Sequence, residues 1–438
     1  MPNGVRSNSA FPVIERSEEL YERAKKKIPS VTQTLAKGPT QYVKGVAPKY
    51  LDHGKGCRVW DVDGNEYIDF NMGIGPISLG YCYPRVDNAI KAQLEKGITF
   101  SLMHPLEVEV AELFASVVPN AERIRYSKTG CDVTSAAVRL ARAFTGREKI
   151  LTCGYHGWHD WTIATTDRNR GIPAAVRTLT GTFSYNDIDS LASQLDDGTA
   201  AVIMEPMLFE FPKDDFLAKV REVCTRNGAL LIFDEMWTGF RLALGGAQEY
   251  FGVNADLATY SKAVANGMPI SMLAGRADVM SLLEQDVFFY TTFGGEALSL
   301  AAASATIQEL RDRQVPGALK SAGARLIDGY NALAQKLSLG YTKCVGMGAR
   351  SLVTFDASAG NALEVKSLVQ QELLKRGILW QGMHALSYSH TDADIDYALD
   401  VYREVLPILK KAIAEGNPRQ YLRGEPVQPV FRTVTAKR

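Results

Sequence analysis

The sequence predicts an α/β protein with a mostly parallel sheet in its large domain and a smaller α+β domain at its C-terminus. Between about residues 120 and 313, short apolar runs alternate with helical stretches, which is the pattern of a mostly parallel sheet covered by helices. After about residue 315, one strand and two helices indicate the smaller domain. At roughly 150 residues per domain, a chain of 438 residues predicts two or three domains.

The first part of the chain is expected to form a separate segment. A helical pattern covers Glu15–Lys27, and Arg58–Phe70 alternates with period two around Asp63-Gly64, which is a strong hairpin signal. We therefore divide the chain into an N-terminal segment at 1–70, a large domain at 71–315 and a small C-terminal domain at 316–438.

The large domain is expected to contain strands and helices in alternation. A helix that ends at Gly228 leads at once into the apolar run 229–235, as in a β-α-β unit. The expected strands are 123–127, 149–154, 200–206, 229–235, 257–261 and 270–275, and the expected helices are Thr134–Phe144, Asp214–Arg226 and Glu296–Arg313. In the small domain we expect a strand at 351–355 and helices at Ala362–Arg376 and Asp392–Ala414.

Charge and composition exclude several classes of protein. The 49 basic residues balance 49 acidic ones, which argues against binding to nucleic acid or to an anionic membrane. No apolar run approaches the roughly 18 residues of a membrane span, and the first residues lack an apolar signal core. The 6 cysteines form no CxxC pair and no metal-ligand spacing, so we expect reduced thiols and a cytoplasmic location.

Chemically useful side chains follow the expected strands. In open α/β sheets, ligands gather at the carboxyl ends of the strands. Asp234, Lys262, the Lys128–Asp132 run and the Tyr155–His159 run each follow a different strand. Together they supply a carboxylate, an amine, an anion-binding helix start and aromatic faces. Pyridoxal 5′-phosphate (PLP) requires this set, with a lysine for the Schiff base and an acid on its ring nitrogen.

Each feature also has a simpler interpretation. An acidic pair after a strand can be a helix cap, and a lysine at a strand end is usually solvated. Asp132 could act only as an N-cap, and Tyr155 and Trp158 could be core aromatics. His156 and His159 lie three apart, but no acidic or thiol partner falls at a useful spacing, so a metal site is disfavoured.

The sequence resembles the class III PLP-dependent aminotransferases of fold type I, and within them the glutamate-1-semialdehyde aminomutase branch. The stretch 234–269 contains the family's Asp-Glu-x-x-Thr-Gly-Phe-Arg block and the lysine that follows at fixed spacing. The segments WDVDGNEYIDF, TSAAVRLARAFTGREKI, YHGWHD, MEP, RGIL and LSYSHTDADID also match in the family's order. The resemblance covers roughly residues 40–415.

The resemblance implies a role for each matching residue. It implies that Lys262 holds the cofactor and moves protons at the substrate carbon, and that Asp234 pairs with the ring nitrogen. It also implies a homodimer with active sites at the interface, where a threonine of the partner subunit reaches the phosphate. The remaining implied cofactor contacts are the phosphate-binding Thr129, Gly130 and Cys131, the ring-covering Tyr155 and Met236, Glu205 beside the ring, and Thr292 as the threonine that reaches across.

The sequence departs from the aminomutase branch where substrate recognition is expected. Gln41 stands where that branch has an arginine for the substrate carboxylate, and Met72–Pro76 replaces Gly-Ser-Trp-Gly-Pro. Gly295-Glu296 replaces the usual Gly-Asn, and Cys131-Asp132 replaces Thr-Glu. A glutamine cannot form a charged, bidentate clamp on a carboxylate.

These departures favour an aminotransferase over an aminomutase. The expected donor is glutamate or glutamine, and the expected acceptor is an aldehyde or ketone such as an oxidised sugar or aminocyclitol. Another arginine, Arg241, Arg423 or Arg432, would hold a carboxylate in the opposing interpretation. A glutamate-1-semialdehyde-type aminomutase, a PLP-dependent epimerase or racemase, and an inert binding protein remain alternatives. A nicotinamide-dependent enzyme is excluded, because no GxGxxG follows an early strand.

Overall fold

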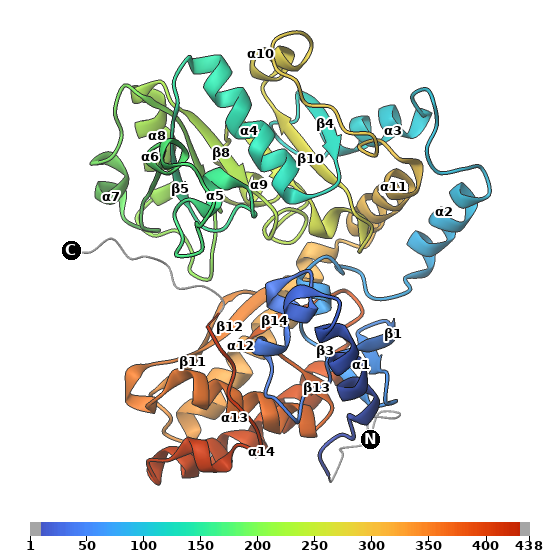
Figure 1. The fold of residues 1–438 in the computed structure, drawn as a ribbon, viewed down its shortest axis with the longest axis vertical. Helices are drawn as coiled ribbons and strands as arrows, with labels where there is room; N and C mark the ends of the chain where they lie inside the picture. The colour runs from blue at the N-terminus through green and yellow to red at the C-terminus, as the bar shows by residue number, and fades with distance from the viewer. Residues whose placement is uncertain (1–9, 430–438) are drawn as a thin grey trace. The chain divides into compact units, whose positions relative to one another are not determined.

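The structure is a computed structural model and describes residues 10–429. These residues form two compact units (Figure 1). One unit combines the described part of Met1–Tyr83 with the described residues from Ala318 onward, and the other spans Pro84–Gly317. Residues of the predicted N-terminal segment and of the predicted C-terminal domain therefore share one unit, while the three-part division itself stays a prediction. Within the described range, no helix combines the length and the apolar character of a membrane span.

The unit Pro84–Gly317 is built on a seven-stranded sheet with the order β4-β10-β9-β8-β7-β5-β6. Only β10 runs antiparallel to its neighbours, so the predicted mostly parallel sheet is confirmed. The strands are β4 (Arg123–Ser127), β5 (Lys149–Cys153), β6 (Thr180–Thr182), β7 (Thr199–Met204), β8 (Leu230–Asp234), β9 (Leu257–Tyr260) and β10 (Ser271–Gly275).

The register of this sheet brings the carboxyl ends of the strands to one edge. Cys153 at the end of β5 pairs with Met204 at the end of β7, and Met204 pairs with Phe233 in β8. Asp234 at the end of β8 pairs with Thr259 in β9. Because β10 is antiparallel to both β9 and β4, β4 also ends at this edge. The residues that follow these strands are therefore neighbours.

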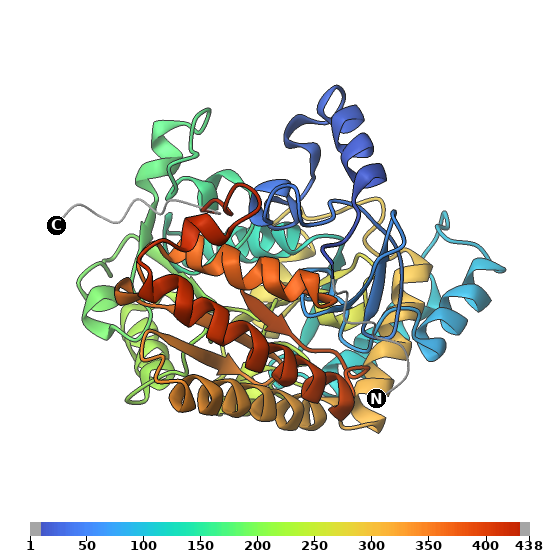
Figure 2. The ribbon, with the colours of Figure 1, turned by 90° about the horizontal axis from the view of Figure 1, so that it is seen from below.

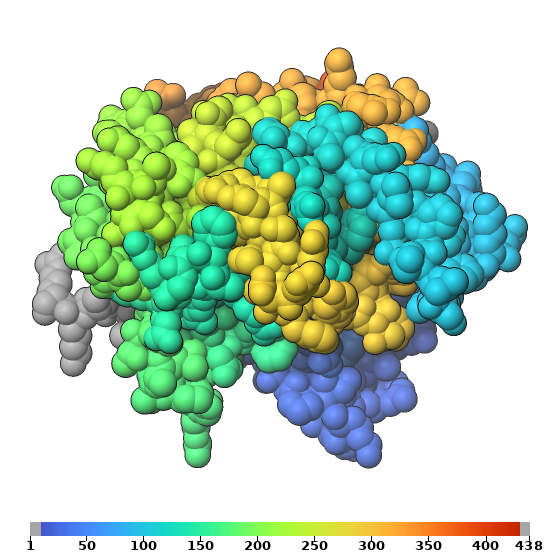
Figure 3. Space-filling model, turned by 90° about the horizontal axis from the view of Figure 1, so that it is seen from above, coloured from blue at the N-terminus to red at the C-terminus, as the bar shows by residue number. Residues whose placement is uncertain are grey.

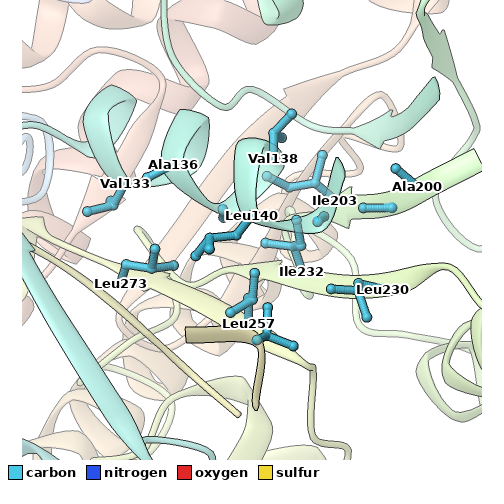
Figure 4. Close-up of a cluster of buried hydrophobic side chains, with 14 of the residues drawn as sticks. Val133, Ala136, Val138, Leu140, Ala200, Ile203, Leu230, Ile232, Leu257 and Leu273 are labelled. Carbon is cyan, nitrogen blue, oxygen red and sulfur yellow. The ribbon is translucent and has the colours of Figure 1, made fainter. Parts of the chain in front are cut away.

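Helices bury the faces of the sheet. The central helix α4 (Gly130–Thr145) lays an apolar face on the strands, where Val133, Ala136 and Leu140 point toward side chains of β7, β8 and β9 (Figure 4). The other α-helices of this unit are α2 (Pro84–Leu94), α3 (Pro105–Ala115), α5 (Asp160–Ile163), α6 (Ala174–Thr178), α7 (Ile188–Ala192), α8 (Phe216–Asn227), α9 (Ala247–Phe251), α10 (Ala277–Met280) and α11 (Ala297–Asp312).

Two predicted helix starts are wrong by a few residues, each for a local reason. Helix α4 begins at Gly130 and not at Thr134, because Thr129 caps it from one turn further back. Helix α8 begins at Phe216 and not at Asp214, because Asp214 and Asp215 have φ angles of 50° and 56°, outside the helical region. Helix α11 agrees with its prediction to within one residue at each end.

The other unit contains two smaller sheets. The predicted hairpin around Asp63-Gly64 is confirmed as β2 (Arg58–Asp61) paired with β3 (Glu66–Asp69). The first sheet has the order β1-β2-β3-β13 and the second the order β11-β12-β14. Their remaining strands are β1 (Leu51–Lys55), β11 (Thr342–Met347), β12 (Arg350–Phe355), β13 (Ile378–Leu379) and β14 (Met383–Ala385).

Three long helices pack beside these strands (Figure 2). Helix α14 (Asp392–Ala414) has the predicted bounds, and α13 (Ala362–Lys375) ends one residue before its prediction. Helix α12 (Val315–Lys336), which starts at the boundary between the units, was not predicted, and α1 covers Glu15–Lys25. The 3-10 turns of the described chain are η1 (Pro29–Val31), η2 (Leu35–Lys37), η3 (Pro39–Gln41), η4 (Met72–Ile74), η5 (Lys262–Ala265), η6 (Ser281–Leu283), η7 (Ala357–Ala359) and η8 (Pro418–Tyr421).

Candidate active site

The candidate site lies at the carboxyl edge of the seven-stranded sheet. Asp234 is the last residue of β8, Glu205 directly follows β7, and Lys262 lies two residues beyond β9. Tyr155 follows β5 by two residues, and Thr129 follows β4 by two. The sequence therefore places five candidate residues behind five strands of one sheet, and the parallel register puts them at the same edge.

Asp234 forms a buried pair with His156. Oδ2 of Asp234 lies 2.7 Å from Nδ1 of His156, and the two residues are only 1% and 2% exposed. Oδ1 accepts a hydrogen bond of 3.0 Å from the backbone N–H of Met236. An ionised carboxylate can only accept, so Nδ1 donates to it, and Nε2 of His156 has no hydrogen-bond partner among the described residues. Both carboxylate oxygens are held, which fixes the direction of the Asp234 side chain.

This role of His156 was not predicted. The sequence suggested only a place in the aromatic Tyr155–His159 run and a disfavoured metal site with His159, whose Nδ1 lies 2.5 Å from Oγ of Ser135 on α4. Within residues 10–429, no group of three or more potential metal ligands occurs. The available signal was the position of His156 one residue beyond Tyr155, behind a strand of the same sheet edge.

Lys262 begins the turn η5 in an unusual backbone conformation. Its φ angle is 42°, in the left-handed region, and Asn266 at the far end of the turn has a φ angle of 43°. Residues other than glycine persist there only where the surrounding structure imposes it, commonly at functional sites. Its Nζ lies 4.1 Å from the ring centroid of Trp237, within the range of a cation–π contact. The half-buried Lys262 side chain thus contacts Trp237 in the loop that follows β8.

The loop between β4 and α4 presents the start of a long helix. The Oγ1 atom of Thr129 accepts from the N–H of Asp132, and the Asp132 carboxylate accepts from the N–H of Thr129 at 2.8 Å. Thr129 is therefore the N-cap, and Asp132 completes the capping box from the third helical position. Burial raises the pKa of Asp132, but hydrogen bonds from Thr129, Ser127 and Lys128 outweigh it and lower the pKa overall.

Gly130 and Cys131 lie in the first turn of α4, where backbone N–H groups have no partner within the helix and attract anions. A Cβ atom on Gly130 would lie 3.0 Å from Sδ of Met236, so the loop after β8 packs closely against this turn. Met236 is 8% exposed. The candidate phosphate-binding residues and Met236 are thus brought together.

Tyr155 and Glu205 are joined through the backbone. The N–H of Tyr155 donates to Oε1 of Glu205 at 3.1 Å. Gly154 has a φ angle of 111°, and a Cβ atom there would lie 2.9 Å from the same oxygen. Glu205 therefore shapes the turn that presents Tyr155, whose side chain is 53% exposed at the sheet edge.

Two further residues of the loop after β8 stabilise its shape. Glu235 is buried and accepts hydrogen bonds from the N–H groups of Ala247 and Gln248 and from the hydroxyl of Thr238. Burial raises the pKa of Glu235 to about 7, although these hydrogen bonds lower it. Arg241 donates to the carbonyl oxygens of the loop, at 3.4 Å for Met236 and 3.2 Å for Trp237.

Two other arginines were considered for a substrate carboxylate, Arg423 and Arg432. The Arg423 guanidinium lies 4.1 Å from the ring centroid of Phe11, in the unit that also contains Gln41. Arg432 lies outside the described residues. Arg241 is 3% exposed.

Glu296, which replaces an expected asparagine, ties the loop between β4 and α4 to helix α11. Nζ of Lys128 donates to Oε1 of Glu296 at 2.7 Å and to Oγ of Ser299 at 3.2 Å. Thr292 lies in the loop before α11 and is exposed. Among the described residues, no hydrogen bond or ion pair joins Thr292 to the other candidates.

Comparison with known proteins decides the family. The sequence model of the family described as Aminotransferase class-III matches residues 41–406. The chain belongs to the class III aminotransferases. The predicted family, the PLP-dependent aminotransferase activity and the PLP cofactor are therefore confirmed at the level of the family.

Curated relatives of this class III chain include two kinds of enzyme. The 3-aminobutyryl-CoA aminotransferase of Cloacimonas acidaminovorans is 35% identical over 413 residues, which cover 91% of this chain and 99% of the relative. A glutamate-1-semialdehyde 2,1-aminomutase of Acetivibrio thermocellus is 36% identical over 419 residues, which cover 88% of this chain and 96% of the relative. Sequence identity of this size does not separate the two reactions.

Several solved structures have the same fold. The FumI protein of Sphingopyxis sp. MTA144, solved in its PLP internal aldimine form, is 29% identical and superposes with a TM-score of 0.85 over 93% of this chain and 99% of that chain. A β-phenylalanine aminotransferase from Variovorax paradoxus is 26% identical, with a TM-score of 0.80 over 90% of this chain and 94% of that chain. The predicted fold type I is confirmed.

Proposed function

We propose that this class III aminotransferase moves an amino group from glutamate or glutamine to an aldehyde or ketone acceptor that carries no carboxylate near its carbonyl group. An oxidised sugar or an aminocyclitol would be such an acceptor. The observation that carries the proposal is Gln41. It stands where the aminomutase branch is expected to have an arginine for the substrate carboxylate.

Gln41 is neutral and already engaged. The residue is 1% exposed, and its Nε2 donates to the backbone carbonyl of Gln428 at 3.1 Å. A carboxylate is recognised strongly by a charged, planar guanidinium that donates two parallel hydrogen bonds. A buried amide carries no charge, and the Nε2 donors of Gln41 are already engaged by the Gln428 carbonyl and, at 3.3 Å, by Oγ1 of Thr40. This supports an acceptor without a carboxylate.

The residues at the sheet edge fit PLP. The Lys262 amine would hold the cofactor and move a proton at the substrate carbon. The Asp234 carboxylate, oriented by His156, would keep a proton on the ring nitrogen, and a buried carboxylate there is compensated by the cation it faces. When bound, PLP supplies an electron sink for the carbanion formed at the substrate carbon.

Other residues would contact the phosphate group and the two ring faces of PLP. The first-turn N–H groups of Gly130 and Cys131 and the Thr129 hydroxyl would bind the phosphate. Met236, packed against Gly130, would cover one ring face, and the exposed ring of Tyr155 would cover the other. Glu205, whose carboxylate holds the turn that presents Tyr155, would lie beside the ring.

We further propose that the enzyme works as a homodimer, with Thr292 of each subunit reaching the phosphate of the other. The surface of the unit Pro84–Gly317 supports this. Leu102, Met103 and Phe288 are 80%, 82% and 74% exposed, which is unusual for large apolar side chains. Residues near 280–290 (yellow) lie on the face shown in Figure 3, beside the stretch that carries α2 and α3 (cyan). Burial against a second copy would remove this apolar surface from water.

The proposal is tested with an acceptor panel. The purified enzyme with PLP is given L-glutamate or L-glutamine and then either carboxylate-free sugar aldehydes and ketones or glutamate-1-semialdehyde. We expect amino transfer to carboxylate-free acceptors with a kcat/KM at least tenfold higher than for the semialdehyde, and no turnover by Lys262→Ala.

Two results would overturn this proposal. Conversion of glutamate-1-semialdehyde without an external donor would indicate an aminomutase, as the relatives with that name favour. Exchange of the substrate α-proton with solvent without nitrogen transfer would indicate an epimerase or racemase.

A further inference from the structure

The described chain ends in a segment that crosses helix α13. After α14 the chain forms the turn η8 (Pro418–Tyr421) and then runs extended to residue 429. Figure 2 shows this end of the chain in dark red beside α13. The segment lies beyond residues 41–406, which the family model matches. The segment belongs to the unit that contains residues 40–44.

Helix α13 binds the segment through two side chains. Nε2 of Gln371 donates to the carbonyl of Tyr421 at 3.0 Å, and Oε1 of Gln371 accepts from the N–H of Arg423 at 2.8 Å. One turn earlier, Oγ of Ser367 accepts from the N–H of Val427 at 2.9 Å. The amide of Gln371 thus makes the kind of hydrogen bonds that a neighbouring β-strand would make. It donates to one carbonyl and accepts from one N–H of the same backbone segment.

The preceding residue of α13 binds residues 40–44 in the same way. Nε2 of Gln370 donates to the carbonyl of Gln41 at 3.1 Å, and Oε1 accepts from the N–H of Val43 at 2.8 Å. Gln370 and Gln371 are 0% and 1% exposed. Two adjacent buried glutamines therefore hold two segments from opposite ends of the chain.

The two segments also bind each other. The N–H of Gln428 donates to the carbonyl of Thr40 at 2.8 Å, and the N–H of Lys44 donates to the carbonyl of Glu425 at 3.2 Å. The order of these bonds makes the pairing antiparallel. Between them, the side chain of Gln41 donates to the carbonyl of Gln428. The side chain at position 41 is thus part of the pairing.

A glycine permits this close approach. A Cβ atom on Gly424 would overlap the carbonyl oxygen of Lys44, which is a backbone atom and cannot rotate away. Only glycine fits where two backbones come this close. Replacing Gly424 by alanine should therefore separate residues 421–428 from residues 40–44 without changing a polar side chain.

We propose that residues 421–428 form a strap that determines acceptor specificity: it fixes residues 40–44 and binds the amide of Gln41, so that position 41 cannot recognise a substrate carboxylate. The proposal deepens the proposed function and rests on it. A charged side chain at position 41 would have to displace the Gln428 carbonyl before it could reach a ligand. Acceptor selection therefore depends on the docked strap as well as on the identity of residue 41.

The first test is hydrogen exchange in the full-length enzyme. Gly424→Ala is compared with the wild type and with Gly340→Ala, whose Cβ would meet nothing within 4 Å. We expect the amides of residues 40–44 and 421–428 to exchange at least tenfold faster in Gly424→Ala and at the wild-type rate in Gly340→Ala. Unchanged exchange in Gly424→Ala would overturn the proposal. No substrate is needed, so this result is independent of the proposed function.

The second test measures specificity. In Gly424→Ala we expect the KM of the carboxylate-free acceptor to rise at least fivefold with little change in kcat. Adding Gln41→Arg to Gly424→Ala should raise the preference for a carboxylate-bearing acceptor at least tenfold over Gly424→Ala alone, and more than Gln41→Arg does in the otherwise wild-type chain. Faster exchange without a change in either KM or preference would overturn the role in specificity. Absence of amino transfer to every acceptor would instead overturn the proposed function.

Discussion

At the scale of single residues, the Asp234–His156 pair carries the strongest constraint on the site. Both side chains are almost fully buried, and every oxygen of the carboxylate has a donor. A buried hydrogen bond to a charged group contributes roughly 1.5–3 kcal/mol, and the loss of one partner leaves the other group unsatisfied. We therefore expect His156 to be a positioning residue that acts through Asp234.

Replacing His156 tests this role. We expect His156→Phe to weaken PLP binding and lower kcat by about ten- to hundredfold, which is the range that the loss of one such hydrogen bond predicts. PLP affinity is measured by fluorescence titration and kcat by amino transfer. The control is His53→Phe, because His53 is on the surface and pairs with exposed Asp52. Wild-type PLP affinity in His156→Phe would contradict the role.

Residues of the candidate site that follow a strand can be predicted from the sequence. A residue that joins the site only through a contact with a distant part of the chain cannot. Lys262 and Asp234 are recognisable because they directly follow apolar runs. The partner of Asp234 is 78 residues away in the sequence, and only the parallel pairing of the strands makes them neighbours. Thr292 was placed by resemblance alone, and no contact in the described chain tests it.

At the scale of elements, helix α12 shows why some of the fold could not be predicted. It contains glycines at 317, 323 and 329 and a proline at its second position, residues that usually mark turns. Two of the glycines serve packing. A Cβ on Gly323 would overlap the carbonyl oxygen of Gly348, and one on Gly329 would meet Leu399 at 2.6 Å. These glycines are required by contacts with residues that are distant in the sequence, and a single sequence does not show those contacts.

Alanine substitutions at two glycines of α12 are expected to change the free energy of unfolding in opposite directions. Alanine favours a helix interior over glycine by about 1 kcal/mol. Gly317→Ala, which meets nothing within 4 Å, should leave the unfolding free energy unchanged or raise it by up to about 1 kcal/mol. Gly323→Ala should lower it by about 2 kcal/mol or more, because overpacking against backbone exceeds the gain in propensity. Denaturant titration measures both, and equal effects would refute the packing role of Gly323.

At the scale of the whole molecule, buried histidines and a buried glutamate have pKa shifts with opposite effects on the pH dependence of stability. Burial lowers the pKa of His384 to about 3 and that of His390 to about 4, and both histidines lie in the unit with α13 and α14. The unit with α13 and α14 also contains Asp61 and Asp69, whose pKa values are raised by burial. In the other unit, burial raises the pKa of Glu235 to about 7. The histidines are therefore held neutral where unfolded histidines would be charged, and Glu235 is held protonated where an unfolded glutamate would be ionised.

The two histidines and Glu235 should consequently contribute to the pH dependence of stability in opposite directions. As pH falls from 6.5 toward 4, unfolded histidines bind protons and the buried ones do not, so each histidine lowers the stability of its unit by about 1.4 kcal/mol per pH unit. As pH rises from 4.5 to 7, an unfolded glutamate releases its proton before Glu235 does, so Glu235 lowers the stability of its unit over that range.

Native-state hydrogen exchange in the core of each unit checks this expectation between pH 4.5 and 7, after correction for the intrinsic pH dependence of exchange. Glu235→Gln, which stays neutral, should remove the trend in the unit Pro84–Gly317 and leave the other trend unchanged. A parallel response of both units would show that these groups do not control the pH dependence.

The strap also has a consequence for the order in which the protein is made. Gln41 and Gln428 are 387 residues apart, so the N-terminal member of this pairing is synthesised long before the other. At 5–20 residues per second, translation of the intervening chain takes about 20 to 80 s. During that time residues 40–44 lack the hydrogen bonds that the strap provides, although the seven-stranded sheet, whose last strand ends at Gly275, is synthesised before the strap. A nascent chain should therefore acquire its cofactor site before its final selectivity, and the ribosome releases the protein only after the segment that confers that selectivity has been added.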